Sequence, residues 1–589
     1  MRKLFVLVLA ALVSTALLIP SATSRTQQES TREYVVVYER AISLATARAA
    51  VERIGGTVVK ENRKVGVATV RTSNDDFVAD AVAQRALFGA ASNRPVGAVG
   101  PLQKKKFSEE RLDSERRASM RGGAQAATAT GGAGDSGEFE TFAPLQWDMQ
   151  MIGATKYESH DIQPGERGVR VGILDTGIDG SHPDIAPNFD RALSRNFTTD
   201  LETIVSVPCE DDPEELCEEP LDGPCADEPD GSCSDPADVD ENGHGTHVAG
   251  TVGAAVNGLG IAGVAPEVTL INIRAGQDSG FFFLQPSVDA LTYAADIGVD
   301  VVNMSYFIDP WLFNCRNNPA DSPEAQAEQR TIIAATQRAL SYAHRNGVTL
   351  IAAAGNGHQN YDRKDEIVDE TSPDFPPGTA YPREITEDCL DLPTEGKNVI
   401  SVTAVGPSTR KAYYSDYGRS HAAVSAPGGD FRDYPGTPRF QTPENLVLSA
   451  YPENVAREFG EIDGNGDPTT PFVLKDCEDE SNPDTCAYWT YFQGTSMASP
   501  HAVGVAALIV SEHGQRDRKE GGLELNPNRT ERLLTRSASE HACPQPRLFS
   551  YEDSELPEDF DAFCAGGLRR NGFYGHGIVD AYAAVLRER

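Results

Sequence analysis

A turn of small residues that runs into an apolar stretch, Gly494 to Val510, constrains this chain more than any other feature. Residues 494–496 allow a tight turn, and residues 502–510 are apolar enough for a buried helix. Ser496 would then stand at a helix N-terminus, where unpaired backbone N–H groups and the helix dipole favour an anionic oxygen. A serine there is usually only a helix cap, so a role as an acyl-transfer nucleophile requires partners elsewhere.

Three other motifs supply the side chains that such a serine needs. Asp175 ends a predicted strand, His244 opens a predicted helix, and Asn356 follows another predicted strand. A serine hydroxyl needs a neighbouring base, and the base needs a carboxylate that fixes its tautomer. The Asn356 amide can donate to the oxyanion that forms during attack on a carbonyl. Alone, each residue would be a cap or a packing residue, but together they indicate catalysis.

Strand-like and helix-like patterns alternate through the large C-terminal part of the chain, residues 144–589. Strands are predicted at 169–174, 299–305, 348–354 and 399–405, and helices at 245–256, 287–297 and 325–344. This alternation predicts an α/β fold, a doubly wound and mostly parallel sheet with helices on both faces and reactive groups at the strand ends. Insertions at 200–242, 357–395 and 430–489 are rich in Asp, Glu, Pro and Gly, so we expect surface loops there.

The N-terminal 143 residues divide into three segments. Residues 1–24 have the basic start, apolar run and small residues of a signal peptide, although an uncleaved anchor is the alternative. Residues 31–102 predict a small α+β unit with strands at 34–38, 65–70 and 96–99 and helices at 45–54 and 77–87. Residues 103–143 have the composition of a flexible, protease-accessible linker.

Charge and cysteine content narrow the possible partners. A formal net charge of −36 argues against nucleic acid and anionic membrane surfaces as partners. Ten cysteines in an exported chain predict about five disulfides, with no close pairs of the zinc-binding kind. The expected pairings are within Cys209, Cys217, Cys225 and Cys233, between Cys477 and Cys486, and between Cys543 and Cys564.

The order Asp175, His244, Asn356 and Ser496, with the motif around each, resembles the subtilisin-like serine peptidases from about Trp147 to Val585. The resemblance implies that Asp175 orients His244, that His244 is the base and later the acid, and that Asn356 stabilises the oxyanion. It implies a secreted serine endopeptidase that acts on polypeptides, is monomeric, and uses no organic cofactor. Residues 31–102 resemble the family's ferredoxin-like propeptide, which would inhibit the precursor from within the same chain.

The resemblance also suggests binding residues. Substrate would lie along Ser305, Tyr306 and Phe307 and along Ala354 and Gly355, with Ala380 at the base of the main pocket, which favours a modest apolar side chain before the cut. A structural calcium ion would be held by Asp184, Asn257, Leu259 and Ile261. A loop that is held together without an ion is the alternative. His247 lies on the same predicted helix face as His244 and is expected to be a packing residue, and we expect structural roles for His182, His501 and His576.

Two other interpretations compete with that of a peptidase. A catalytically silent binding protein with the same fold would lack a triad or oxyanion residue, and none is missing. An α/β-hydrolase esterase needs Gly-x-Ser-x-Gly and the order Ser, acid, His, whereas Ala498 occupies the fifth position and the order here is Asp, His, Ser. The motif and the order therefore exclude the esterase interpretation.

Overall fold

The computed structural model describes residues 31–93 and 140–586, except 202–203, 209–215, 224, 226–231, 376–377, 480 and 517–521. The predicted signal peptide, most of the predicted linker, the strand expected at 96–99 and Cys209 lie outside the described residues. Within the described parts, none of the helices combines the length and apolar character that crossing a bilayer requires.

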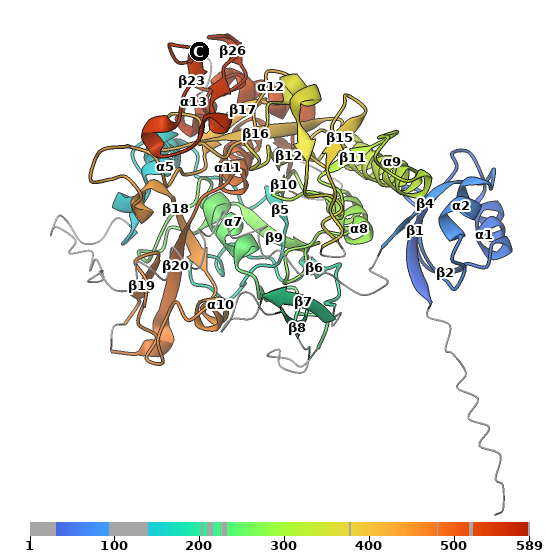
Figure 1. Cartoon of the computed structure of the whole chain (residues 1–589). Helices are drawn as coiled ribbons and strands as arrows, with labels where there is room; N and C mark the ends of the chain where they lie inside the picture. Colours follow the sequence, from blue (N-terminus) through green and yellow to red (C-terminus); the bar gives the residue numbers. More distant parts are fainter. Residues whose placement is uncertain are drawn as a thin grey trace, which may run out of the picture.

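A seven-stranded sheet forms the centre of the large domain (Figure 1). Its order is β17-β16-β12-β10-β5-β9-β6, and every adjacent pair is parallel. The strands are β5 (Arg170–Leu174), β6 (Arg195–Asn196), β9 (Thr269–Arg274), β10 (Val301–Met304), β12 (Thr349–Ala353), β16 (Val399–Val405) and β17 (Val424–Pro427). The strands predicted near 170, 300, 350 and 400 are confirmed, while β6, β9 and β17 were not predicted.

Helices cover both faces of this sheet, as the sequence predicted. The helices α7 (His244–Gly253) and α11 (Thr495–His513) share one apolar core with Val301 of β10. The helices α8 (Leu284–Asp296) and α9 (Pro323–Arg345) share a second core with Val302, the next residue of β10. Neighbouring strand residues therefore point into opposite cores, which is the arrangement of a buried parallel strand.

The insertions are more ordered than loops. Residues 430–492 form a three-stranded antiparallel sheet, β18-β20-β19, which continues to the start of α11. Its elements are β18 (Val447–Tyr451), α10 (Glu453–Glu458), β19 (Val473–Cys477) and β20 (Cys486–Phe492). Tyr451, Phe472 and Trp489 are fully buried within it. The expectation of a surface loop at 430–489 is therefore wrong, because these aromatic side chains give the segment a core.

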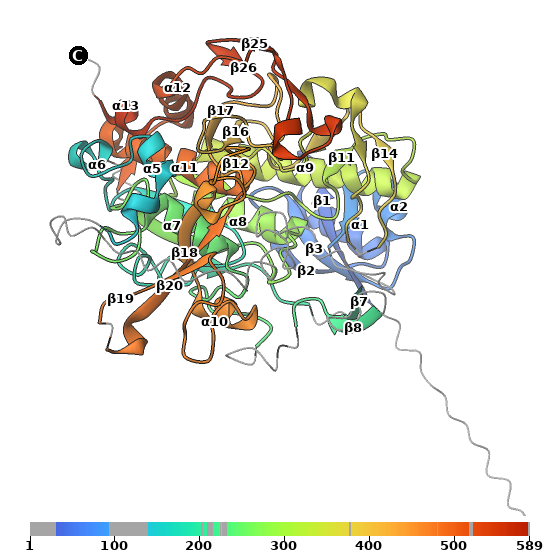
Figure 2. The same ribbon diagram turned by 60° about the vertical axis from the view of Figure 1, so that its left-hand side comes forward.

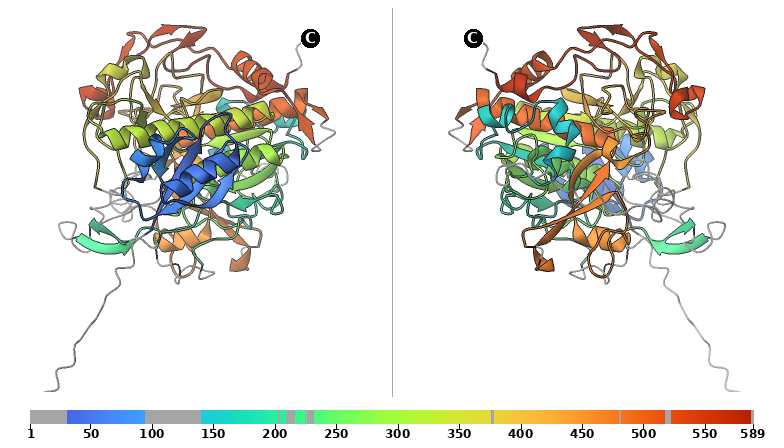
Figure 3. Two further views of the ribbon diagram at one scale, coloured as in Figure 1. Left: turned by 90° about the vertical axis from the view of Figure 1, so that its right-hand side faces the viewer. Right: turned by 90° about the vertical axis from the view of Figure 1, so that its left-hand side faces the viewer.

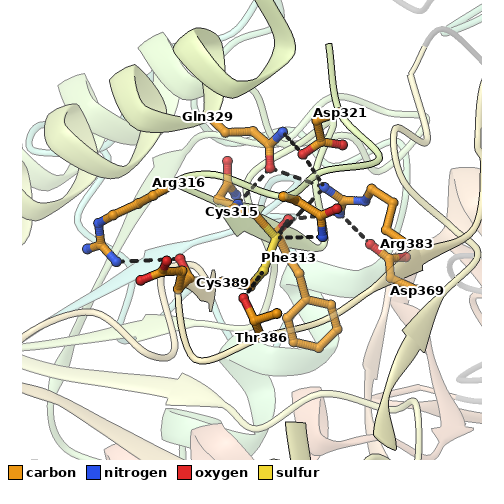
Figure 4. The surroundings of a disulfide bond; sticks show 12 residues. Phe313, Cys315, Arg316, Asp321, Gln329, Asp369, Arg383, Thr386 and Cys389 are labelled. Atoms are coloured by element: carbon orange, nitrogen blue, oxygen red, sulfur yellow. Dashed lines mark hydrogen bonds and ion pairs between the residues drawn. A yellow bond between two sulfur atoms is a disulfide. The ribbon is translucent and has the colours of Figure 1, made fainter. Parts of the chain in front are cut away.

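The insertions at 200–242 and 357–395 also contain ordered pairs. The first holds the antiparallel strands β7 (Ile204–Pro208) and β8 (Leu216–Pro220), and the second holds β13 (Val368–Asp369), β14 (Arg383–Glu384) and β15 (Cys389–Asp391). The strand β15 pairs with β11 (Phe313–Cys315), and a disulfide joins Cys315 to Cys389 across this pair (Figure 4). Arg383, in the second insertion, is among the largest fully buried side chains. A surface loop is therefore also the wrong description of residues 357–395.

Four disulfides are described. Three of them, Cys225–Cys233, Cys477–Cys486 and Cys543–Cys564, confirm predicted pairings, and Cys315–Cys389 joins two cysteines for which no partner was predicted. The domain also contains the shorter helices α5 (Trp147–Met151), α6 (Ser159–Ile162), α12 (Pro527–Ser537) and α13 (Ala581–Val585). Its remaining short strands are β21 (Gln515–Arg516), β22 (Leu523–Glu524), β23 (Leu548–Phe549), β24 (Ala562–Phe563), β25 (Gly566–Gly567) and β26 (Arg570–Asn571). Figure 2 shows α12 and α13 near α11, in the upper part of the molecule.

Residues 32–92 form a separate unit with the order β2-β3-β1-β4. Its elements are β1 (Arg32–Tyr38), α1 (Leu44–Arg53), β2 (Thr57–Asn62), β3 (Val67–Thr72), α2 (Phe77–Val82) and β4 (Leu87–Ser92). This βαββαβ topology is ferredoxin-like, as predicted. The helix predicted at 77–87 ends at Val82, and the unpredicted strand β4 begins at Leu87. One face of its sheet packs Val35, Val37 and Ala91 on α8 and α9, and the left panel of Figure 3 shows the unit lying over these helices.

Candidate active site

Asp175 and His244 form a buried pair at the end of β5. The Nδ1 atom of His244 lies 2.7 Å from Oδ1 of Asp175, and both side chains are almost fully buried. Burial raises the pKa of the Asp175 carboxyl, and the nearby His244 imidazole opposes that rise. The backbone N–H of Thr176 also donates to Oδ1 at 2.8 Å. This geometry fixes one imidazole tautomer, with the proton on Nδ1 and Nε2 available as a base.

Asp240 is a positioning residue that the sequence analysis missed. One of its carboxylate oxygens accepts from the backbone N–H of Thr246 at 3.0 Å, at the start of α7. Its other oxygen accepts from the Thr176 hydroxyl at 3.2 Å and from the backbone N–H of Gly243 at 3.0 Å. Asp240 therefore holds the residue after Asp175 and the helix that carries His244. Its only sequence signal is an acidic residue shortly before a helix start.

Ser496 and Asn356 are brought together through Thr495. The Asn356 side-chain oxygen accepts from the backbone N–H and from the hydroxyl of Thr495, both at 2.9 Å. Since this oxygen is bound by Thr495, the Nδ2 donor of Asn356 faces away from it. The Thr495 hydroxyl in turn accepts from the backbone N–H of Gly355 at 3.0 Å. Thr495 thus fixes the orientation of the amide next to the predicted nucleophile, a role that sequence analysis did not assign.

The second turn of α11 carries a proline that affects the serine directly. Pro500 lies four residues after Ser496 and has no N–H, so the Ser496 carbonyl cannot make its usual helical hydrogen bond. The Ser305 hydroxyl donates to this carbonyl at 3.0 Å. Ser305 itself follows β10 and accepts from the Asn303 amide at 2.9 Å. Ser305, predicted as a substrate residue, therefore also braces the serine turn.

The other histidines of these motifs have structural partners. His247 is fully buried, stacks on Phe492 and lies 3.1 Å from the Val447 carbonyl through Nε2. Burial lowers the pKa of His247 to about 3, so the ring is neutral. His182 lies 3.0 Å from the Tyr488 carbonyl, and His501 lies 2.8 Å from the Met497 carbonyl. These contacts agree with the packing roles expected for them.

The predicted substrate residues have different surroundings. Tyr306 is buried and stacks on Phe282 with ring centroids 4.2 Å apart, so its side chain belongs to the core. The Ala354 N–H donates to the Val402 carbonyl, and the Ala354 carbonyl lies 2.8 Å from Nε2 of His421. Because both backbone groups of Ala354 already have partners, a substrate strand cannot pair with this residue. Residues 354–355 therefore lie beside Asn356 without offering backbone groups for strand pairing. Ala380 is exposed, in a stretch next to two residues that are not described, and Phe307 is half-buried.

The side chains predicted to hold calcium already have hydrogen-bond donors. One Asp184 oxygen accepts from the Asn257 amide at 3.1 Å, and the other accepts from the Ile261 N–H at 3.1 Å and the Trp489 indole at 2.8 Å. The Asn257 side-chain oxygen accepts from the Leu259 N–H at 2.9 Å. Because these oxygens face N–H groups, they do not fit a calcium ion, which requires free oxygen ligands. The structure favours the alternative, a loop held without an ion.

We expect Trp489→Phe to lower the free energy of unfolding by about 1.5–3 kcal/mol at pH 8, because it removes a hydrogen bond to a carboxylate. Burial raises the pKa of Asp184 to about 7, so this carboxyl is mainly charged at pH 8. Urea unfolding followed by fluorescence measures the loss, which should be the same in chelator and in calcium. Trp147→Phe is the control, since the Trp147 indole donates at 2.8 Å to a neutral carbonyl, that of Leu446. If calcium restored the stability of Trp489→Phe, the interpretation of a loop held without an ion would be contradicted.

Comparison with known proteins gives one consistent family. The model of the Subtilase family matches residues 166–577. The chain is 26% identical over 373 residues to subtilisin DY of Bacillus licheniformis, which covers 63% of this chain and 85% of that protein. It is 26% identical to a thermophilic serine proteinase of Bacillus sp. strain AK1, covering 60% of this chain but only 54% of that relative.

Solved structures show the same fold at lower sequence identity. The epidermin leader peptide processing serine protease of Staphylococcus aureus is 19% identical with a TM-score of 0.57, covering 95% of this chain and 100% of that one. Fervidolysin of Fervidobacterium pennivorans, a keratinolytic enzyme, is 19% identical with a TM-score of 0.51, covering 96% of this chain and 62% of that one. These two likenesses support the subtilisin-like fold.

Proposed function

This chain belongs to the subtilase family of serine endopeptidases, and from that premise we propose that Asp175, His244 and Ser496 are its catalytic triad. The single observation that carries the proposal is the buried pair of Asp175 and His244, with Oδ1 and Nδ1 2.7 Å apart. His244 lies on α7, which packs against α11, the helix of Ser496. Asn356, oriented by Thr495, stands beside the serine as the oxyanion donor. The substrates are polypeptides.

In the proposed reaction Ser496 Oγ attacks the scissile carbonyl carbon while His244 Nε2 takes the hydroxyl proton. Asp175 stabilises the imidazolium that forms. The tetrahedral oxyanion accepts from the Asn356 amide and from the backbone N–H of Ser496. His244 then gives the proton to the leaving amine, and water hydrolyses the acyl-enzyme by the same steps in reverse.

Residues 31–102 act as an inhibitory propeptide in this proposal. Apolar contacts and ion pairs both support docking of the unit on α8 and α9. Asn62 donates to Asp289 at 2.8 Å, and the Lys60 ammonium lies 2.7 Å from the same carboxylate. Arg338 of α9 donates to the Tyr38 carbonyl at 2.8 Å. A chain made with this unit in place would be a self-inhibited precursor, secreted by its N-terminal signal and stabilised by disulfides outside the cell.

A fluorophosphonate label tests the catalytic assignment. It should modify the wild-type protein at Ser496 once the propeptide is removed, because only an activated serine reacts. The Ser496→Ala protein should remain unlabelled under the same conditions. A wild-type protein that binds peptides but never reacts with the label would support the alternative, a silent binding protein of the same fold.

Cleavage of a mixed peptide library tests which side chain the enzyme prefers before the cleaved bond. We expect a modest apolar side chain before the cut, as the sequence near Ala380 suggests, and no requirement for a charged one. The measurement is mass spectrometry of the products at low conversion. A strict preference for Arg or Lys at that position would contradict the expectation.

We expect Gly89→Leu to weaken inhibition by the N-terminal unit roughly 5- to 140-fold, the effect of about 1–3 kcal/mol of overpacking. A Cβ atom at Gly89 would lie 2.3 Å from the Thr331 hydroxyl on α9, so the unit must shift away from the helix. The measurement is the lag before full activity in freshly secreted enzyme, which should shorten. Phe88→Leu, on the exposed face of β4, is the control and should keep the lag. An unchanged lag in Gly89→Leu would argue against inhibition through this contact.

A further inference from the structure

A cluster of carboxylates surrounds Arg274, at the end of β9 and outside the proposed catalytic centre. The guanidinium pairs with Asp200 at 3.1 Å, with Asp278 at 2.8 Å and with Asp235, and its Nε donates to the Gly276 carbonyl at 3.1 Å. The side chains of Arg274, Asp200 and Asp235 are at most 1% exposed, and that of Asp278 is 10% exposed. Three carboxylates against one guanidinium leave two negative charges in the ionised cluster.

Two carboxylate oxygens of this cluster have no hydrogen-bond donor. Oδ2 of Asp200 and Oδ2 of Asp278 are both buried and have no partner among the described residues. One oxygen from each of Asp200, Asp235 and Asp278 lies within 4.8 Å of the other two. Because Arg274 supplies one positive charge against three carboxylates, a second cation could balance the negative charge that remains.

Several hydrogen bonds hold these carboxylates in position. The Gln277 amide donates to the Thr199 carbonyl at 2.8 Å and so ties the residue before Asp278 to the residue before Asp200. The side-chain oxygen of Gln277 is itself buried without a donor among the described residues. The Asp200 N–H donates to the carbonyl of Cys233, which is in a disulfide with Cys225. The oxygen atoms are therefore pre-organised, which lowers the cost of binding an ion.

We propose that Asp200, Asp235 and Asp278 bind a divalent cation of the calcium type. Calcium takes six to eight oxygen ligands at about 2.3–2.6 Å, so two ligands of one ion can lie about 4.6–5.2 Å apart, which accommodates this cluster. Magnesium requires near-ideal octahedral geometry and loses its water ligands reluctantly, so a cluster of protein carboxylates suits it less well. The Gln277 oxygen and water would complete the shell, and Arg274 would remain as a second counter-ion.

The cluster lies close to the proposed base, since the Asn242 amide donates to the Asp278 carbonyl at 2.7 Å and its oxygen accepts from the His244 N–H at 3.2 Å. An ion here would stabilise the segment that precedes α7.

The test uses full-length Ser496→Ala protein, stripped with chelator, so that it depends on neither self-cleavage nor activity. Calcium chloride and magnesium chloride are titrated separately by calorimetry, and thermal unfolding is followed with each. We expect calcium to bind and to raise the unfolding temperature, with magnesium weaker. Asp200→Asn should lower the calcium affinity at least about tenfold, because even residues that only contact a ligand typically cost about 10–100-fold when they are replaced. Asp278→Asn, at the least buried member, is the second variant and should do the same.

Asp184→Asn is the matched control, because it removes a buried carboxylate at the other candidate site. It should keep the calcium affinity and the calcium-induced rise in unfolding temperature. The proposal is overturned if calcium does not bind, or if both cluster variants bind it as tightly as the parent. It is also overturned if Asp200→Asn raises the unfolding temperature in chelator and calcium has no effect on the parent, because a shared proton then explains the cluster.

Discussion

Replacing Ser496 by Ala is expected to lower kcat for a peptide substrate by about 10⁶-fold. In subtilisin, the enzyme in which this was measured, loss of the nucleophile costs ~2 × 10⁶ in kcat, and what remains comes from the oxyanion site and binding. The proposed oxyanion donors, the backbone N–H of residue 496 and the Asn356 amide that Thr495 orients, do not depend on the hydroxyl. KM should change little, because the hydroxyl acts mainly in the transition state. Steady-state kinetics on activated enzyme measure both constants.

Ser499→Ala is the matched control for this variant. Ser499 is a buried serine on the same helix, and its hydroxyl donates to the Asn303 side-chain oxygen at 2.7 Å. Its loss should cost about 1 kcal/mol of stability through one hydrogen bond and leave kcat near the wild-type value. Equal activity in Ser496→Ala and wild type, with contaminating proteases excluded, would refute the assignment of the nucleophile.

The proposed catalytic residues could be picked out of the sequence because each stands in a short local motif. Asp175 ends an apolar strand, and His244 and Ser496 each begin a helix, so the pattern of elements places them at one edge of the sheet. Asp240 and Thr495 position these groups through contacts between distant segments. No local pattern distinguishes such a residue from an ordinary cap or turn residue, so their roles required the structure.

Composition misled the prediction where a few large side chains outweigh many polar ones. The segment 430–489 is rich in Asp and Gly, yet Tyr451 and Phe472 anchor it, together with Trp489. The strand β4 was missed because small residues, which have low strand propensity, make up much of it. Small residues are needed there because Gly89 approaches α9 so closely. Both errors arose because tertiary packing overrode local preference.

The contacts of Asp184 could not be predicted from the sequence for a similar reason. The loop motif was present, but its ligand oxygens are taken by N–H donors, one of which, Trp489, comes from an insertion about 300 residues later in the chain. Sequence order alone cannot show that contact. The carboxylates around Arg274 were equally hidden, because Asp200, Asp235 and Asp278 come from separate segments of an acidic region.

Arg383→Met is expected to lower the free energy of unfolding by about 3–5 kcal/mol, the cost of leaving buried charges without their partner. The Arg383 guanidinium is fully buried, pairs with Asp369 and lies 3.4 Å from Asp321. It also donates to the Gln329 side chain at 3.1 Å and to the Phe313 carbonyl at 2.8 Å, beside the Cys315–Cys389 disulfide (Figure 4). Removing the guanidinium leaves two buried carboxylates facing an apolar side chain. An unpaired charge is costly there because the protein interior solvates it poorly.

The measurement is the urea midpoint of Ser496→Ala protein with and without the change, which avoids self-digestion during unfolding. Arg363→Met is the control, because Arg363 is 55% exposed and its pairs with Asp365 and Glu366 lie at the surface. Surface pairs contribute about 0–1 kcal/mol, so this midpoint should hardly move. Adding Asp369→Asn to Arg383→Met should recover part of the loss, since it removes one unpaired charge. A double variant less stable than Arg383→Met would show that lost packing, and not the buried charge, dominates at this site.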